Sequence, residues 1–122
     1  MIAALMLMGA LILQDPATEK AERMSRGHGL LEACEAWALL SSGEMGTPEQ
    51  HIMFWRCAEY TKGVADTLDA TSMLCLPDGV TNGQQRAVVL KYLRDHPERL
   101  HELRSKLVRD ALQKAWPCKA KS

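Results

Sequence analysis

Residues 47–68 read TPEQHIMFWRCAEYTKGVADTL, and this stretch predicts a long helix with one buried face. Thr47 is expected to be its N-cap, with Pro48 at the first helical position and Gln50 three residues after the cap. Apolar side chains and a cysteine then recur at steps of four, three, four and four residues, which is the spacing of a buried helical stripe: Met53, Cys57, Tyr60, Val64 and Leu68.

Two residues of this helix need their own explanation. Tyr60 is expected in the core, with its hydroxyl bonded to the backbone. Gly63 costs the helix about 1 kcal/mol relative to alanine. The expected use of Gly63 is the close approach of another helix.

The rest of the chain is also helical in its periodicity, and no alternating strand pattern persists. Helices are predicted at about 29–40, 84–95 and 97–115. Their inward positions are predicted to be Leu30, Cys34, Trp37 and Ala38, then Ala87, Leu90 and Leu93, then Leu100, Leu103, Leu107, Ala111 and Ala115. The sequence therefore predicts an all-α fold, a small disulfide-stapled bundle of about four main helices in two hairpins.

Proline and glycine mark the corners. In SMLCLPDGVTNGQQ, residues 72–85, Pro77 and Gly79 are expected to turn the chain, and Thr81 or Asn82 to cap the next helix. Pro97 ends one helix and is expected to open another, since the residue before a proline avoids helical geometry. Trp116 and Pro117 are expected to stop the last helix.

The composition excludes an obvious nucleic-acid binder. Lys+Arg and Asp+Glu are equal at 15 each, so the basic excess typical of such proteins is missing. The charges are unevenly distributed, because residues 1–75 carry ten acidic and five basic side chains and residues 76–122 carry the reverse. The two halves either attract each other within one fold or present an acidic surface to a basic partner.

The amino terminus predicts export. Residues 1–13, MIAALMLMGALIL, are too few for a membrane-spanning helix, but they fit the apolar region of a secretory signal. We assign 1–17 to a signal peptide of uncertain cleavage site, 18–118 to one helical domain and 119–122 to a tail. The alternative for the first residues is a buried or frayed helix.

Four cysteines, Cys34, Cys57, Cys75 and Cys118, favour two disulfides in a short exported chain. Three pairings are formally open. Cys34–Cys57 with Cys75–Cys118 needs the least threading, because each bridge then staples one helical hairpin. Cys75 is expected to be buried and unreactive. No close cysteine pair suggests zinc, so no metal or cofactor is predicted.

No catalytic constellation is visible. Ser41, Ser42 and the scattered carboxylates have no spacing that demands chemistry. The histidines show no signature of a base beside a nucleophilic thiol: His28, His51, His96 and His101. The prediction is that the protein is not an enzyme; a small hydrolase would need a reactive cysteine.

Four motifs in order resemble the type VI secretion amidase immunity family, the Rap/Tai immunity proteins. They are CAEYTKGV at 57–64, CLPDGVT at 75–81, VVLKYLRDHPE at 88–98 and ALQKAWPC at 111–118. One departure is Trp116, where phenylalanine is more usual. The resemblance implies a periplasmic, helical, disulfide-bonded protein of a Gram-negative bacterium, often a homodimer. Such a protein blocks a toxic effector, for the best-known members a peptidoglycan amidase, by covering its active site.

Exposed loop residues are the predicted contacts with that effector, because loops on a rigid scaffold usually carry binding. They are Glu44, Met45 and Gly46 in one loop, and Asp78, Asn82 and Gln84 in the other. Met45 is either an anchor or folds back on the core, and Asp78 either mimics an acidic group or caps a turn. The rival interpretations are a general periplasmic stress chaperone or a small helical protein that binds another partner.

Overall fold

The computed structural model describes residues 15–119, and the regular secondary structure of this range is helical. Within this range there is no strand, only an isolated antiparallel pairing of Arg26 with Leu103. The all-α class is confirmed, but the predicted count of about four helices is slightly wrong, since residues 15–119 contain five α-helices. These are α2 Pro16–Met24, α3 Gly27–Ser41, α4 Pro48–Ala70, α5 Asn82–Asp95 and α6 Arg104–Ala115, with a 3₁₀-helix η1 at Pro97–Arg99.

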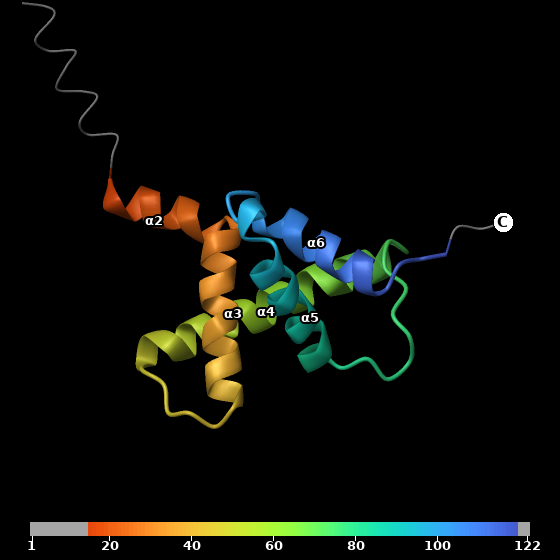
Figure 1. Cartoon of the computed structure of the whole chain (residues 1–122), viewed down its shortest axis with the longest axis horizontal. Helices are drawn as coiled ribbons and strands as arrows, with labels where there is room; N and C mark the ends of the chain where they lie inside the picture. Colours follow the sequence, from red (N-terminus) through yellow and green to blue (C-terminus); the bar gives the residue numbers. More distant parts are fainter. Residues whose placement is uncertain (1–14, 120–122) are drawn as a thin grey trace, which may run out of the picture.

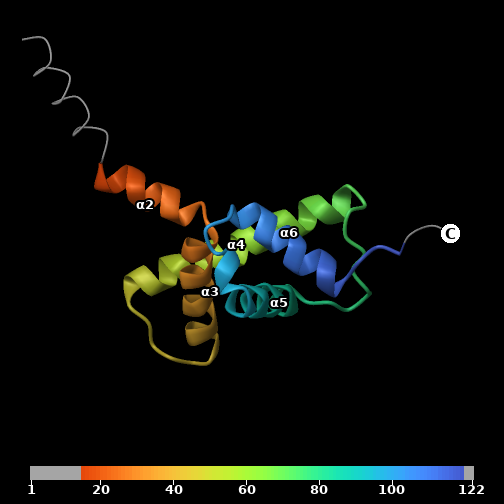
Figure 2. The same ribbon diagram turned by 45° about the horizontal axis from the view of Figure 1, so that its top comes forward.

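Helix α4 is the longest element, at 23 residues, and α3, α5 and α6 all contact it. Helix α3 crosses α4 near one end, and α5 and α6 lie toward the other (Figures 1 and 2). The predicted start of α4 is confirmed. The Thr47 N–H donates to Gln50 Oε1 at 2.9 Å, and the Gln50 N–H donates to Thr47 Oγ1 at 3.2 Å, which forms a capping box.

The core lies where these helices meet. Among the described residues, only two buried side chains are polar, Thr61 and Gln85. The buried apolar cluster draws on α3, α4, α5 and α6 and on two connecting segments: Leu30, Ala33, Cys34, Cys57, Ala65, Leu68, Leu74, Val89, Leu90, Leu93, Leu100, Leu107, Val108, Ala111 and Leu112.

Two disulfides join these elements in the predicted pairing. Cys34–Cys57 links α3 to α4 inside the core, where both residues are 0% exposed. Cys75–Cys118 ties the α4–α5 connection to the segment after α6. The expectation that Cys75 is buried is wrong, because its neighbour Leu74 takes the core position and the cysteine faces solvent.

Helix α5 begins as predicted and buries a different face. Thr81, rather than Asn82, is the N-cap, with a second capping box to Gln84 at 2.7 and 3.1 Å. Ala87 was predicted to face inward but is exposed. The larger Val89 and the amide of Gln85 fill the inward positions instead, together with Leu90 and Leu93.

The predicted single helix over 97–115 is interrupted. Pro97 opens η1, and α6 starts only at Arg104. Tertiary hydrogen bonds replace the missing helical ones: the Gly27 N–H donates to Glu102 O at 2.9 Å, and the Arg104 N–H donates to Ser25 O at 3.0 Å. This backbone pairing turns Leu103 outward, so its predicted burial is wrong; half of it is exposed.

The last helix ends where the sequence predicted. Helix α6 stops at Ala115 with Trp116 as its C-cap, and Pro117 follows. Ala115 itself was predicted to face inward but is exposed. The predicted signal segment falls mainly on residues 1–14, outside the described residues, and most of the tail also lies outside them. Helix α2 begins at Pro16, and within 15–119 no helix is long and apolar enough to cross a membrane.

Candidate functional site

The α3–α4 loop presents an apolar side chain to solvent on a fixed frame. Met45 is 100% exposed, so it does not fold back on the core. The loop begins at Gly43, whose φ of +95° favours glycine, and ends at the Thr47 capping box. A Cβ at Gly46 would meet the end of the Leu40 side chain, which would have to shift to make room. The tip of the loop, Glu44 and Met45, therefore projects from well-held ends.

The α4–α5 connection is held differently. The Cys75–Cys118 bridge and a hydrogen bond from Gln113 Nε2 to Met73 O at 2.9 Å anchor it to the end of α6. Asp78, Asn82 and Gln84 are all exposed, although Gln84 is engaged in the α5 capping box.

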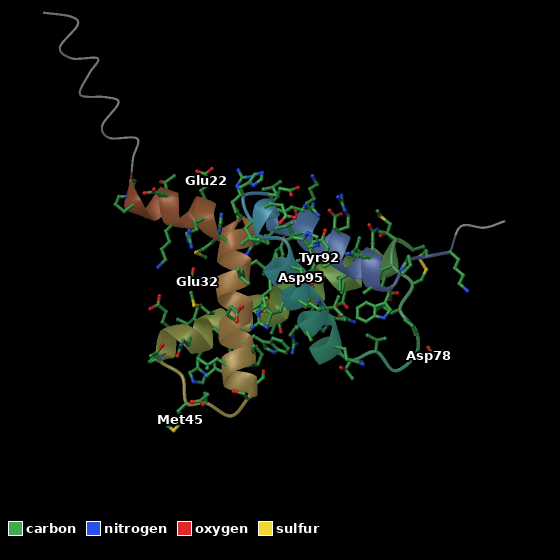
Figure 3. The ribbon with its side chains drawn as sticks, in the orientation of Figure 1. Glu22, Glu32, Met45, Asp78, Tyr92 and Asp95 are labelled. Atoms are coloured by element: carbon green, nitrogen blue, oxygen red, sulfur yellow. A yellow bond between two sulfur atoms is a disulfide. The ribbon has the colours of Figure 1, made fainter. Side chains whose placement is uncertain are left out.

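The structure does not bring the two predicted contact loops together. Met45 and Asp78 lie at opposite ends of the molecule (Figure 3), and the two loops stay apart in the second view as well (Figure 2). The α3–α4 loop is the stronger candidate, because a groove and further exposed apolar side chains accompany it.

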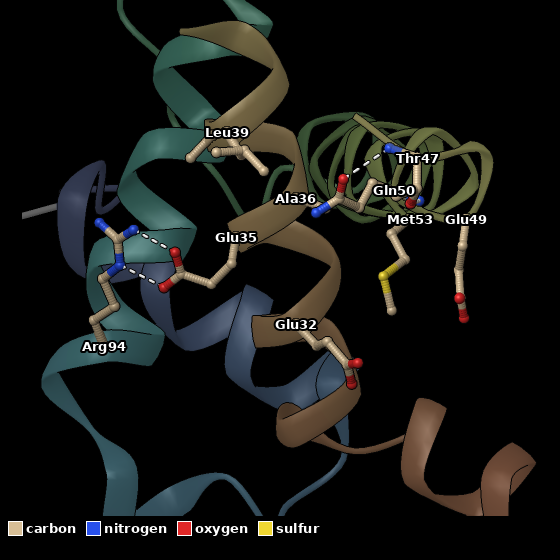
Figure 4. A pocket seen from close by; sticks show the side chains of 10 residues that line it. Glu32, Glu35, Ala36, Leu39, Thr47, Glu49, Gln50, Met53 and Arg94 are labelled. Carbon is tan, nitrogen blue, oxygen red and sulfur yellow. Dashed lines mark hydrogen bonds and ion pairs between the residues drawn. The ribbon is translucent and has the colours of Figure 1, made fainter. Parts of the chain in front are cut away.

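An acidic groove lies beside this loop, between α3 and the first turns of α4 (Figure 4). Its volume is about 710 Å³. Three carboxylates line it, from Glu32, Glu35 and Glu49, together with the apolar side chains of Leu39 and Met53. This end of the molecule therefore carries part of the acidic excess found in the first 75 residues.

One of the three carboxylates is neutralised within the chain. Arg94 of α5 donates from Nε and Nη2 to the two oxygens of Glu35, at 2.7 and 2.5 Å. This fork lowers the pKa of Glu35 from its ordinary value, so the carboxylate stays ionised. Glu49 has no ion-pair partner within 15–119, whereas Glu32 has only a long contact of 3.9 Å with Arg23.

Sequence reasoning missed two exposed apolar residues on α4. Trp55 is 60% exposed and Ile52 is 56% exposed, and their spacing of three places them on one helix face. Both residues fall outside the buried stripe through Met53 and Cys57, and this position in the sequence could have indicated that they are exposed. We use the name α3–α4 surface for the exposed residues at the end of α3, in the loop and in the first turns of α4: Leu39, Glu44, Met45, Ile52 and Trp55. Trp55 follows Met53 by two residues, about 200° around the helix, so it faces away from the groove that Met53 lines.

Such a surface suits protein recognition. Exposed aromatic and methionine side chains are the usual anchors of an interface, and a polar rim surrounds them. Phe54 packs edge-on against Trp55 with ring centroids 5.2 Å apart, which supports the exposed indole from one side.

Two motif residues have roles other than those predicted. Tyr60 is half-buried at the core's edge, and the Arg104 guanidinium lies 3.9 Å from its ring centroid. Gly63 is exposed, and a Cβ there would meet nothing within 4 Å, so no helix in the described chain approaches it closely. Gly79 has φ +87° and turns the chain beside Pro77, as expected.

The described residues offer no chemistry that competes with binding. All four cysteines are bonded, and no group of three or more potential metal ligands occurs within 15–119. Of the histidines, His96 contacts Glu98 at 2.9 Å and stacks on Tyr92, a surface arrangement next to η1.

Comparison of the sequence with known proteins and family models identifies the protein family. A search of curated proteins finds no match. The family model of the Rap1a immunity proteins matches residues 26–118, which include α3 to α6 and both disulfides. Members of this family inhibit an effector and are not enzymes. The chain therefore belongs to the Rap1a immunity proteins.

Proposed function

We propose that this protein acts in the periplasm, where it binds a toxic type VI secretion effector, a peptidoglycan amidase, and protects the producing cell by covering the enzyme's active site. Family membership supports an immunity role against a secreted effector. Two disulfides favour an oxidising compartment, and the apolar residues 1–13 favour an exported chain.

The observation that carries the proposed contact is the α3–α4 surface. It combines a fully exposed Met45 with a largely exposed Trp55, and the acidic groove lies on the side of α4 that faces α3. A basic rim around an amidase active site would complement the free carboxylates of that groove. The mechanism is steric and needs no catalytic group from the immunity protein.

A hydrolysis assay tests this proposal. The oxidised protein is titrated into a purified type VI amidase effector acting on purified peptidoglycan. We expect inhibition that is complete at one immunity chain per enzyme, and Trp55→Ala should weaken it at least about tenfold, as for an interface anchor. Ala87→Leu, on an exposed position of α5, is the matched control and should inhibit normally.

The same experiment separates the rival interpretations. A general chaperone would protect unrelated unfolding proteins and would leave the amidase active. Sedimentation of the free protein tests the proposed homodimer. If the wild-type chain and Trp55→Ala inhibit the amidase equally well, the α3–α4 surface is excluded as the contact. The immunity role is then still supported.

A further inference from the structure

A second groove runs between α4 and α6, which lie side by side (Figures 1 and 2). Its volume is about 760 Å³, and apolar groups form most of its lining. Helix α4 contributes Tyr60, Gly63 and Val64, and α6 with its N-cap contributes Leu103, Lys106 and Arg109.

Gly63 lines this groove, and no close contact within residues 15–119 requires a glycine there. It sits in the middle of a 23-residue helix, where glycine is the least favourable residue apart from proline. Nothing within 15–119 lies within 4 Å of a Cβ built there, so alanine would fit. The missing side chain leaves an open strip of α4 backbone facing the groove.

Leu103, in the same groove, is an unfavourable residue at a helix start. It occupies the N-cap of α6 without a side-chain hydrogen bond, whereas threonine caps both α4 and α5. Half of this leucine is exposed. The backbone around Leu103 is held by its pairing with residues 25–27, but its exposed side chain provides no cap for α6 and lines the same groove as Gly63.

The charges beside the groove are mainly basic along α6. Lys106 and Arg109 line it, and Arg104 lies against the ring of Tyr60. Both groove cations already have an ion-pair partner: Lys106 Nζ lies 2.8 Å from Glu102, and Arg109 Nη2 lies 3.1 Å from Asp110. Arg99 shares the same two carboxylates, at 2.5 and 2.7 Å, so three cations face two carboxylates and a small positive excess remains. Glu59, on the α4 side, is the acidic residue that lines the groove itself.

We propose that the α4–α6 groove is a docking site for an acidic amphipathic helix of a partner protein. The apolar face of that helix lies on Val64 and Leu103, and a small residue at its centre meets the backbone at Gly63. Its carboxylates face Lys106 and Arg109. This site lies outside the α3–α4 surface and does not depend on the effector proposed above.

A designed peptide tests the groove with the intact, oxidised protein. The probe is a fluorescein-labelled helix of about 18 residues, or five turns. It carries leucine on one face, alanine at the centre of that face and glutamate along one flank. Fluorescence anisotropy should show saturable one-to-one binding to the wild-type protein. A matched peptide with lysine in place of glutamate should bind at least about tenfold more weakly, because it faces α6 with like charge.

Gly63→Leu fills the groove with a side chain at a position that tolerates one. We expect it to weaken binding of the acidic peptide at least about tenfold while circular dichroism shows an unchanged helical fold. Ala87→Leu again places a leucine at an exposed helical site elsewhere and should leave the affinity unchanged.

Several results would overturn the proposal. One is the absence of saturable binding at about millimolar peptide, and another is equal binding of the two peptides. Normal binding by Gly63→Leu is a third. If the free chain dimerises and Gly63→Leu makes it monomeric, the groove is instead an interface between two copies. None of these results affects inhibition of the amidase, so the two proposals fail separately.

Discussion

The two disulfides allow a quantitative comparison, because loop length and burial predict opposite rankings. The bridges span 23 and 43 residues. In the chain-entropy model, closing these loops stabilises the folded state by about 3.4 kcal/mol for Cys34–Cys57 and about 4.0 kcal/mol for Cys75–Cys118. Loop length alone therefore makes the second bridge the stronger one.

Burial reverses this ranking. Cys34 and Cys57 are both 0% exposed, so changing both to alanine also removes two sulfur atoms from the packed core. Each cavity of about methyl size costs about 1 kcal/mol, which brings the total to about 5 kcal/mol. Cys75 and Cys118 are exposed, so their removal leaves no cavity and costs at most about 4 kcal/mol.

Urea unfolding followed by far-UV circular dichroism measures the difference. We expect Cys34→Ala/Cys57→Ala to lose about 1 kcal/mol more stability than Cys75→Ala/Cys118→Ala. Titration of thiols in the unfolded variants should find none, which confirms that the remaining bridge is formed. If the exposed bridge proves the costlier one to remove, the burial argument is refuted and loop closure alone governs stability.

Further predictions concern the caps, the charge network and the exposed indole. Thr81→Ala should lower the free energy of unfolding by about 1 kcal/mol, and Thr81→Ser, which retains the cap oxygen, should restore most of it in the same urea assay. Arg99 and Lys106 lower the pKa of Glu102 to about 2, so its contribution is present above the ordinary pKa and is lost as pH falls from about 4.5 toward 2. Urea unfolding between pH 6 and pH 2 should therefore show a shallower loss of stability in Glu102→Gln than in the wild type; parallel curves would contradict this. Trp55→Ala should change the free energy of unfolding by less than about 0.5 kcal/mol, so a large loss would mean that the indole is structural.

The starts of α4 and α5 were the most predictable part of the fold. Thr47 and Thr81 each precede a glutamine by three residues, and both form capping boxes. A capping box joins residues that are three positions apart, so the residues that form it can be recognised in the sequence without knowing the fold. The disulfide pairing was also accessible, because helix order and short connections leave one simple arrangement.

The interrupted helix was not predictable in the same way. Leu103 continues the apolar period of the last helix, but the backbone around it pairs with residues 25–27. Hydrogen bonds between segments this far apart leave no trace in local periodicity. Ala87 failed for a related reason: alanine fits either face of a helix, so its apolar character does not determine its direction.

The candidate surface was only partly predictable. Turn-forming residues identified the loop around Met45, and the structure leaves that side chain fully exposed. The exposure of Trp55 was not predicted, because a tryptophan in a helix is expected to face the core. Its exposure became apparent only when the helices were placed around α4.

The disulfide topology bears on how the protein acquires its fold. Each bridge joins cysteines that follow one another along the chain, the first with the second and the third with the fourth. A chain that enters an oxidising compartment amino end first exposes Cys34 and Cys57 before Cys118 arrives. We therefore expect oxidation in chain order to give the native connectivity without reshuffling by a disulfide isomerase.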